Sequence, residues 1–584
     1  MCGLFGIVSS TTPINVELAN TCLELLKHRG PDQQGTWENS MAYLGHRRLS
    51  IVDLSSNGRQ PMSDKNDSVI ITVNGEIYNY KELYNELKDK HCFKSNSDSE
   101  VILHGFREWG ITQLLSKLEG MYAFSIYDVL NNKLYLARDR IGIKPLYYSI
   151  HCSQLIWASE LKSIERYLHN SLIIDATAMY DFLTYRYIPS PKTMYKYVYK
   201  LEPATFIEYD LNTNNLTKQH YWELNLIINN SRKNIVSEIQ DELSLSLRQH
   251  LIGDVPVNFF LSGGIDSSLL TALACRNSGK VNTYSIGINS KKFDESIYST
   301  QVANHISSNH YSKSFNITDS NILSDKMRDW YDEPFADFSA LPTYLVCQFL
   351  KENGGKVAIS GDGGDEVFGG YSRYFHQHIH RPPGNIQRKS FTFIKTLCDM
   401  SPYYSRLWRL GRLIARTGIY SGLELYADLI DSLPRDKKQL YKNHLEIDTD
   451  YDEYWFFRKY YRKELPVLTR FQYMDIHTYL PEDILTKVDR VSMATSIEVR
   501  VPYLSHKLVE SVFSIPETYR NPNARPKELL AQIAAPYLPK EIIKRPKKGF
   551  GIPKEFRKDE SSGSFLYPQE KILKDHFSSE INLT

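Results

Sequence analysis

The chain has 584 residues, long enough for about two or three domains with separate hydrophobic cores. Its hydrophobic fraction of 42% and charged fraction of 24% are typical of a globular protein, and its net charge of +2 gives no electrostatic reason to expect nucleic acid or a membrane surface as a partner. There is no apolar run of membrane-spanning length, no signal-peptide pattern and no Cys-x-x-Cys pair among the seven cysteines. We therefore expect a cytoplasmic protein without membrane insertion, a zinc site or disulfides.

The N-terminal sequence Met1-Cys-Gly-Leu-Phe-Gly-Ile-Val8 places a cysteine directly after the initiator methionine. If Met1 is removed, Cys2 carries both a thiol and a free α-amino group. The α-amino pKa of about 8 would let that group accept a proton near neutral pH. The alternative is a buried strand that begins with a small apolar cysteine.

Polar motifs recur on turns and strand-like runs over the next 150 residues. In chain order they are His28–Asp32, Gly45–Asp53, a strand Val69–Asn79 that ends at Asn74-Gly75, the cap Ser95–Glu100 of a helix beginning near Val101, and strands at 120–128 and 134–148. Taken alone, Arg48 would be a surface ion pair, Asn74-Gly75 a hairpin turn and Asp98 a helix cap.

Residues 206–234 are polar and rich in Asn and Thr, and we interpret them as a linker with one strand in it. The linker would separate an N-terminal domain, 1–205, from a C-terminal domain, 235–584. The second domain would begin with a helix over Ile235–Ile252, where the apolar spacing is helical.

The stretch Val257-Asn-Phe-Phe-Leu-Ser-Gly-Gly-Ile-Asp-Ser-Ser268 predicts a buried parallel strand, a glycine turn and a helix from Ile265. Free N–H groups of the first helical turn and the serine hydroxyls would form an anion cradle. Asp266 would repel a phosphate unless a cation lay between them, so the loop indicates a magnesium–nucleotide complex. The simpler interpretation is a tight turn with an N-cap. Ser-Gly-Gly-x-Asp-Ser resembles the pyrophosphate loop of the ATP pyrophosphatases, which cleave ATP to AMP and pyrophosphate.

A second glycine-rich acidic loop lies in Lys356-Val-Ala-Ile-Ser-Gly-Asp-Gly-Gly-Asp-Glu-Val-Phe-Gly-Gly-Tyr371, after another predicted strand at 281–288. Strands that alternate with helices predict a parallel sheet with its ligand at the carboxyl ends of the strands. Asp266 and Asp365 should then meet and share a magnesium ion. The alternative is a flexible turn with solvated acids, which so many glycines after a buried strand disfavour.

Together these motifs resemble the glutamine-hydrolysing asparagine synthetase family. Met-Cys-Gly, Arg-Gly-Pro-Asp, Arg-Leu-Ser-Ile-Val-Asp, Asn-Gly-Glu-Ile-Tyr-Asn and Ala-Arg-Asp-Arg-x-Gly-Ile-Lys-Pro-Leu-Tyr-Tyr are similar to the class II glutamine amidotransferase domain. Ser-Gly-x-Gly-x-Asp-Glu-x-Phe-Gly-Gly-Tyr, Leu485–Ala494, Glu498–Tyr503 and Lys547–Pro553 are similar to the synthetase domain. The resemblance implies an N-terminal-nucleophile αββα sandwich, followed by an α/β parallel-sheet ATP-pyrophosphatase domain (adenine nucleotide α-hydrolase-like) with a helical C-terminal part.

The resemblance also implies site residues. Cys2 would attack glutamine, with Asn74 and Gly75 holding the oxyanion. The glutamine pocket would comprise Arg48, Leu49, Ser50, Ile51, Val52, Asn74, Gly75, Glu76 and Asp98. ATP would contact Leu261, Ser262, Gly263, Gly264, Asp266, Ser267, Ile286, Ser360 and Gly361, with Mg²⁺ on Asp266 and Asp365.

This sequence departs from the family at several points. Asp362 stands where the best-known asparagine synthetases have Glu, and either Lys487 or Arg490 could be the basic residue near the adenylate. Residues 373–470 and the tail after 557 match poorly.

The expected function is glutamine-dependent conversion of aspartate to asparagine, with ammonia passing through an internal channel. Amidation of another carboxylate, such as a sugar uronic acid of a surface polysaccharide, and a non-catalytic regulatory or binding role are the alternatives. A homodimer is compatible with all three.

Overall fold

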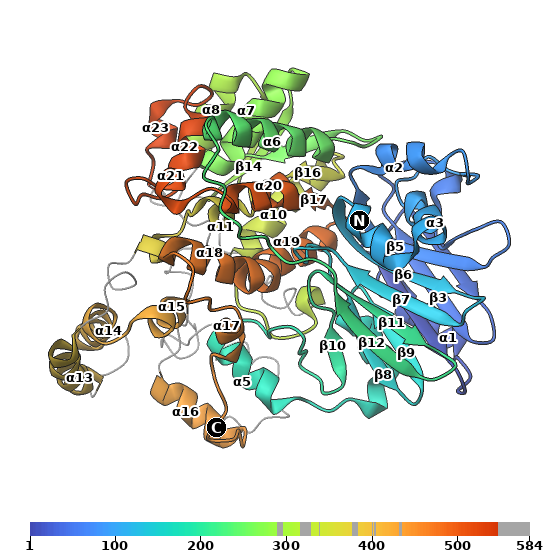
Figure 1. The fold of residues 1–584 in the computed structure, drawn as a ribbon, viewed down its shortest axis with the longest axis horizontal. Helices are drawn as coiled ribbons and strands as arrows, with labels where there is room; N and C mark the ends of the chain where they lie inside the picture. Colours follow the sequence, from blue (N-terminus) through green and yellow to red (C-terminus); the bar gives the residue numbers. More distant parts are fainter. Residues whose placement is uncertain are drawn as a thin grey trace.

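The computed structural model describes residues 1–288, 296–315, 329–337, 339–375, 384–399, 401, 405–430 and 435–546. Three β-sheets and the helices around them make up these residues, with the N-terminal half on one side of the molecule and the C-terminal half on the other (Figure 1). The motif Lys547–Pro553 lies outside the described residues.

Two six-stranded antiparallel sheets form the N-terminal half. The first has the order β10 (Val198–Lys200), β8 (Tyr147–His151), β9 (Gln154–Ala158), β1 (Gly3–Ser9), β3 (Ala42–Arg48), β2 (Gln33–Glu38). The second has the order β12 (Asn215–His220), β11 (Thr205–Asp210), β7 (Lys133–Arg138), β6 (Gly120–Asp128), β5 (Val69–Ile77), β4 (Met62–Ser63). Inward side chains of both sheets, such as Leu4, Ile70 and Trp157, share one apolar core.

Helices cover the outer faces of both sheets. α1 (Val16–Glu24) and α4 (Leu161–Leu168) pack on the first sheet, and α3 (Glu100–Lys117), with α2 (Tyr80–Leu87) beside it, packs on the second. The predicted αββα sandwich is therefore confirmed. In the β1–β3 pairing Gly3 lies opposite Arg47, so Cys2 and Arg48 lie at the same end of the sheet.

The predicted linker at 206–234 is wrong in its first half. β11 and β12 form a hairpin on the edge of the second sheet, and Phe206, Ile207 and Tyr209 are buried in that domain. The N-terminal domain therefore extends to His220. The polar composition that suggested a linker comes from the hairpin turn and from the largely exposed edge strand β12.

One five-stranded parallel sheet organises the C-terminal half, which confirms the second predicted fold. Its order is β15 (Asn309–Phe315), β14 (Asn282–Ile288), β13 (Val257–Phe260), β16 (Val357–Ile359), β17 (Glu498–Arg500). Leu243 of α6 (Ile235–His250) and Leu269 of α7 (Ile265–Ser278) share a core with Phe259 of the sheet, and α8 (Ser296–Ile306) packs beside α7. α10 (Ala340–Glu352) and α19 (Thr486–Ala494) contribute to a different core with Tyr284 and Ala358.

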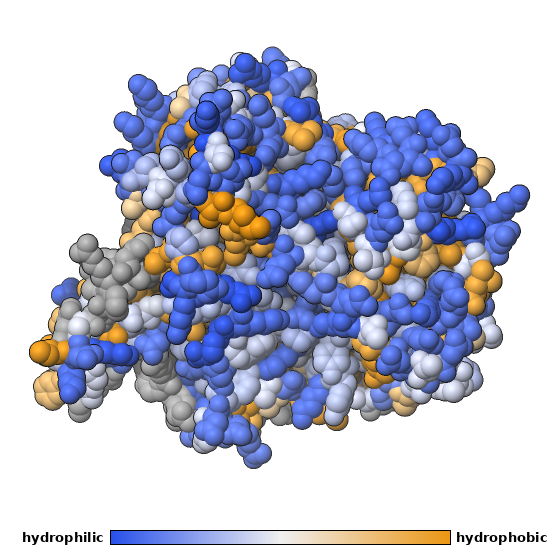
Figure 2. All heavy atoms as spheres, viewed as in Figure 1, coloured by the Kyte–Doolittle hydropathy of each residue, from blue (hydrophilic) through white to orange (hydrophobic). Residues whose placement is uncertain are grey.

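The remaining helices surround this sheet or lie beyond it. They are α5 (Ala176–Tyr185), α11 (Gly364–Phe368), α13 (Asn385–Asp399), α14 (Arg406–Gly418), α15 (Gly422–Ile430), α16 (Arg435–His444), α17 (Trp455–Lys459), α18 (Val467–His477), α20 (His506–Phe513), α21 (Glu517–Arg520), α22 (Glu528–Ala534) and α23 (Lys540–Ile543). No helix in the described ranges is both long enough and apolar enough to span a membrane. Figure 2 shows a mainly hydrophilic surface with scattered apolar patches.

Candidate functional sites

Cys2 lies just ahead of β1, buried at 6% exposure between the two halves of the chain. Its backbone N–H donates to Asn74 Oδ1 at 2.8 Å, and the Leu49 backbone N–H donates toward its thiol. Burial raises the pKa of the Cys2 thiol while Met1 is in place, although the Met1 ammonium, the Leu49 N–H and Arg48 act in the opposite direction. Cys2 is thus fixed in position, and the groups around its thiol partly offset the effect of burial on its pKa.

Asn74 and Gly75 lie within β5 and pair with β6, so they do not form the hairpin turn considered above. The Asn74 side chain is fully buried, and its Nδ2 has no hydrogen-bond partner among the described residues. A Cβ on Gly75 would lie 2.1 Å from the Met121 carbonyl oxygen, so only glycine fits there. An unpaired buried N–H donor in the residue that holds the Cys2 backbone is the arrangement that an oxyanion hole needs.

Arg48, Glu76 and Asp98 are all buried near this end of the sandwich. The Arg48 guanidinium donates to the carbonyl oxygens of Val52 at 3.0 Å and Asp53 at 2.6 Å, which shapes the predicted pocket segment 49–52. The Asp98 carboxylate accepts the Ile77 N–H at 2.7 Å instead of capping α3. Burial raises the pKa values of Glu76 and Asp98, so a bound ammonium group would stabilise their charged forms.

A buried ion cluster joins the start of the chain to β17. The Met1 α-ammonium contacts Glu498 at 2.8 Å, Arg500 Nε donates to Glu498 at 2.6 Å, and Arg500 Nη2 lies 3.3 Å from Glu76. Burial alone would raise the pKa of Glu498, but the Met1 and Arg500 cations hold it at about 2. Arg500 retains this carboxylate if Met1 is removed.

The two glycine-rich loops of the C-terminal half meet, as their order in the sequence predicted. β13 and β16 are neighbouring parallel strands, and the loops follow their carboxyl ends. Ser262 N–H and Oγ both contact Ser267 Oγ, at 3.2 and 3.1 Å, which closes the first loop over the start of α7. A Cβ on Gly361 would lie 2.9 Å from the Ser267 nitrogen, so the second loop touches the first. Ile286 lies in the neighbouring strand β14, and Leu261 packs in the core below the loop.

Lys527 joins the two aspartates. Its ammonium contacts both Asp266 and Asp365, the latter at 2.6 Å, and its side chain is 9% exposed. Burial would lower the pKa of Lys527, but the two carboxylates outweigh it and raise the pKa above its usual value. Sequence reasoning missed Lys527, because a lone lysine ahead of a helix carries no motif.

The same two carboxylates fit a magnesium site. They already converge on one cation, and Mg²⁺ in nucleotide enzymes binds one or two carboxylates together with substrate phosphates. In the described ranges no group of three or more His, Cys, Asp or Glu side chains could hold a metal without such phosphates.

Lys487 and Arg490, the two candidates for the basic residue near the adenylate, lie in different surroundings. Lys487 Nζ donates to Ser339 Oγ at 2.9 Å and lies 3.4 Å from Asp337. Burial lowers the pKa of Lys487, but the charges of Asp337 and Asp362 outweigh it and raise that pKa. Asp362 itself accepts a hydrogen bond from Ser360 Oγ in the second loop.

Arg490 points instead into the interface between the two halves of the chain. Its guanidinium contacts Glu160 at 3.2 Å, Asp332 at 3.1 Å and the Tyr147 hydroxyl at 3.0 Å. The role of Arg490 at the second site stays a prediction, and in this structure its charge is paired with carboxylates of the interface. Lys487 is the one of the pair that lies near Asp362.

Arg29 is a second residue for which the sequence predicted no role of its own. Its fully buried guanidinium donates to the Cys2 carbonyl at 3.0 Å, to Glu160 at 2.8 Å and to both oxygens of Asp489 at 2.8 and 3.1 Å. The His28–Asp32 motif marked the segment, but nothing in the sequence points to a partner on α19.

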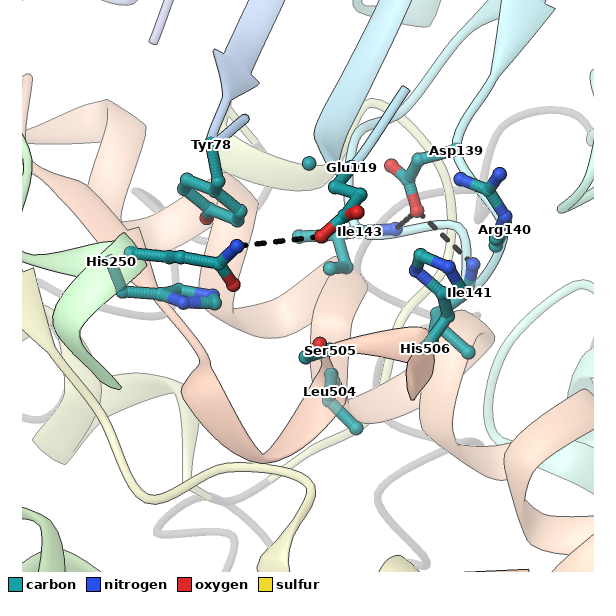
Figure 3. A pocket seen from close by; sticks show the side chains of 12 residues that line it. Tyr78, Glu119, Asp139, Arg140, Ile141, Ile143, His250, Leu504, Ser505 and His506 are labelled. Atoms are coloured by element: carbon teal, nitrogen blue, oxygen red, sulfur yellow. Dashed lines mark hydrogen bonds between the residues drawn. The ribbon is translucent and has the colours of Figure 1, made fainter. Parts of the chain in front are cut away.

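A small pocket lies between the two halves of the chain (Figure 3). Tyr78, Glu119 and the loop 139–143 line it from the N-terminal domain, and His250 and Leu504–His506 line it from the other. The Tyr78 ring packs on the His250 ring at 4.0 Å between centroids, and Asp139 holds its loop by accepting N–H groups, one from Ile143 at 2.9 Å. The pocket is built by both halves, which therefore pack as one unit.

Comparisons with known proteins match both halves of the chain. Residues 1–222 match the glutamine amidotransferase domain family, and residues 238–567 match the asparagine synthase family. The chain is similar to glutamine-hydrolyzing asparagine synthetase 1 of Bacillus subtilis, with 32% identity over 95% of this chain and 87% of that protein. It is also similar to a putative glutamine-hydrolyzing asparagine synthetase of Mycobacterium tuberculosis (31%, covering 95% and 88%) and to Amidase chry2 of Gibberella zeae (28%, covering 95% and 89%).

Proposed function

Because the chain belongs to the asparagine synthase family, we propose that it makes asparagine from aspartate, with glutamine as the nitrogen donor and MgATP as the source of energy. The enzyme would be an ATP-dependent carbon–nitrogen ligase with two sites. One releases ammonia from glutamine, and the other activates the aspartate carboxylate for attack by that ammonia.

At the first site, Cys2 attacks the side-chain amide of glutamine after Met1 has been removed. Its own α-amino group accepts the thiol proton and returns a proton to the leaving ammonia. Asn74 Nδ2 and the Gly75 N–H stabilise the tetrahedral oxyanion. Arg48 binds the α-carboxylate of glutamine, and Glu76 and Asp98 receive its ammonium group. Water then releases glutamate from the thioester.

At the second site, the aspartate side-chain carboxylate attacks the α-phosphate of ATP, giving an acyl-adenylate and pyrophosphate. The loop 261–267 and Ser360-Gly361 would hold the phosphates with backbone and hydroxyl donors. Asp266 and Asp365 would hold Mg²⁺, which neutralises phosphate charge when bound. Lys487 lies near Asp362 and would stabilise the adenylate, and Asp362 would take a proton from the attacking ammonia.

The observation that supports this proposal is that the glutamine-pocket segment and the strand before the second glycine loop share one apolar cluster. Leu49, Ile51 and Val52 belong to this cluster together with Val357, the first residue of β16. From Val357 to Ser360 the strand advances roughly 10 Å. A path of that length inside the interface would keep ammonia from protonation in bulk water.

The test is pyrophosphate release from MgATP and glutamine with and without aspartate, together with amino-acid analysis. We expect aspartate-dependent pyrophosphate with an equal amount of asparagine. Glutaminase activity without a response to aspartate would refute aspartate as the acceptor and move the search to other carboxylates, with uronic acids first. The absence of both activities in protein confirmed to begin at Cys2 would favour a non-catalytic role.

Three finer points belong to the same proposal. Mg²⁺ is the proposed metal because two carboxylates and phosphates suit it, and replacing it by Ca²⁺ should stop pyrophosphate release. We also propose a homodimer in the cytoplasm that needs no nucleic acid. Light scattering and cell fractionation test the assembly and the location.

A further inference from the structure

α13 and α14 pack against each other and form a helical hairpin, described over residues 385–399 and 406–418, that projects from the edge of the molecule (Figure 1). A Cβ on Gly418 would overlap the Phe391 ring, so the two helices are in close contact. The hairpin is held to α15 by Arg416 and Arg412, which lie 2.6 and 3.1 Å from Asp428. Neither proposed site uses any of these residues.

The hairpin exposes an unusual number of large apolar side chains. Ile386 is 85% exposed and Phe393 69% on α13, and Leu407 is 58% exposed on α14. Ile394, Leu397, Leu410 and Leu413 are also exposed. Single exposed apolar residues need no explanation, but seven on one pair of adjacent helices make a patch of the kind that mediates binding. Figure 2 shows apolar atoms beside strongly hydrophilic ones at this tip.

The hairpin is also strongly basic. Residues 384–418 contain seven Lys or Arg and a single acidic residue, Asp399, whereas the net charge of the whole chain is only +2. Lys389, Arg406 and Arg409 are exposed and lie on the same two helices as the apolar residues. The near-neutral net charge of the whole chain therefore conceals a local positive charge. Net charge gave no electrostatic reason to expect a membrane surface as a partner, but the local charge of this segment does.

We propose that the hairpin 384–418 binds the surface of an anionic lipid membrane. Apolar side chains flanked by Lys and Arg on amphipathic helices are the combination that places a helix in the headgroup region, with the aliphatic and aromatic groups below the headgroups and the cations at the phosphates. A nucleic acid would use the cations but leave Ile386, Phe393 and Leu407 in water. Because no described helix can cross the bilayer, binding is peripheral.

Sedimentation of the full chain with lipid vesicles tests the proposal. We expect binding to vesicles containing about 30% phosphatidylglycerol in phosphatidylcholine, little binding to phosphatidylcholine alone, and weaker binding as salt rises. The variant Lys389→Gln/Arg406→Gln/Arg409→Gln should bind about 100-fold more weakly, at about fivefold for each cation removed. The variant Phe393→Ser/Leu397→Ser/Leu410→Ser should lose binding to a similar extent.

The control is Leu130→Ser/Ile227→Ser, which removes two apolar side chains outside the hairpin that are more exposed than those replaced within it, and it should not change binding. The melting temperature and the glutaminase activity of each variant are measured beside those of the wild type, so that a misfolded variant is recognised. Equal binding to neutral and anionic vesicles, or an equal loss in the control, would overturn the proposal. The proposal would also be overturned if the wild-type chain did not bind vesicles but self-associated, or bound an acidic protein, through these residues.

Discussion

Replacement of Asn74 by alanine tests the proposed oxyanion hole directly. Asn74 Nδ2 is a buried donor with no partner among the described residues, so its removal costs no native hydrogen bond of its own. Loss of one oxyanion donor typically lowers the rate about 100- to 1,000-fold, and we expect that loss in the glutaminase turnover. The substitution also removes Oδ1, which accepts the Cys2 N–H at 2.8 Å, and an unsatisfied buried donor costs about 1–3 kcal/mol of stability.

The assay follows glutamate release from glutamine and, separately, pyrophosphate release with ammonia as the nitrogen source. Asn74→Ala should lower the first activity and leave the second near wild type, because the proposed ATP loops belong to the C-terminal half and Asn74 to the N-terminal half. Asn79→Ala is a matched control, since Asn79 is a buried asparagine of the same domain whose amide donates to the Lys117 carbonyl. Equal slowing of glutamine hydrolysis in the control, or equal slowing of both activities in Asn74→Ala, would refute the assignment.

The other predictions concern the second site, the interface and the buried histidines. Lys527→Met should lower pyrophosphate formation at least about 100-fold and spare glutaminase, because it removes a largely buried positive charge beside the proposed phosphate and Mg²⁺ site; an unchanged rate would contradict the role of Lys527. Lys487→Met should abolish synthesis from ammonia, whereas Arg490→Met should chiefly lower stability, by roughly 1–3 kcal/mol, since it removes a buried cation from Glu160 and Asp332, which keep their contacts with Lys162; reversed results would favour a role for Arg490 at the second site. Burial lowers the pKa of His250 to about 3. Below about pH 6.5 this histidine is therefore protonated in the unfolded chain, but it stays neutral in the folded protein down to about pH 3. The free energy of unfolding is therefore highest above pH 6.5 and decreases as the pH is lowered, by roughly 2 kcal/mol per such histidine at pH 5. His250→Gln should reduce the fall in the urea midpoint between pH 7 and pH 5, whereas the exposed His305→Gln should not.

The family resemblance predicted the sandwich, and local patterns predicted the parallel sheet and most of the strands. β6 begins and ends at the predicted residues, as expected for a continuous β-prone run that starts at a glycine and stops at an aspartate. The hairpin of β11 and β12 was misassigned because an edge strand with one polar face has the same composition as a linker. Composition cannot separate the two, and only pairing with β7 does.

Motifs likewise located the residues whose role depends on backbone geometry. The roles proposed for Asn74 and Gly75 rest on the family resemblance. The two glycine loops were predictable from the residues alone, because a close approach of backbone to ligand requires particular residue types in sequence. Lys527 was not, since its function depends on reaching Asp266 from 261 residues away along the chain. Contacts between distant segments leave no spacing that a single sequence can reveal.

The choice between Lys487 and Arg490 marks a limit of another kind. Residues three apart on a helix lie on the same side, so position on α19 gives both side chains access to the same region. Their partners decide: Asp337 holds one, and Glu160 with Asp332 holds the other. Between them, Asp489 accepts both donors of Arg29, which also donates to the Cys2 carbonyl. One helical turn of α19 thus carries contacts to both proposed sites, so a substitution there has to be assayed for glutamine hydrolysis and for adenylation before it is assigned to either.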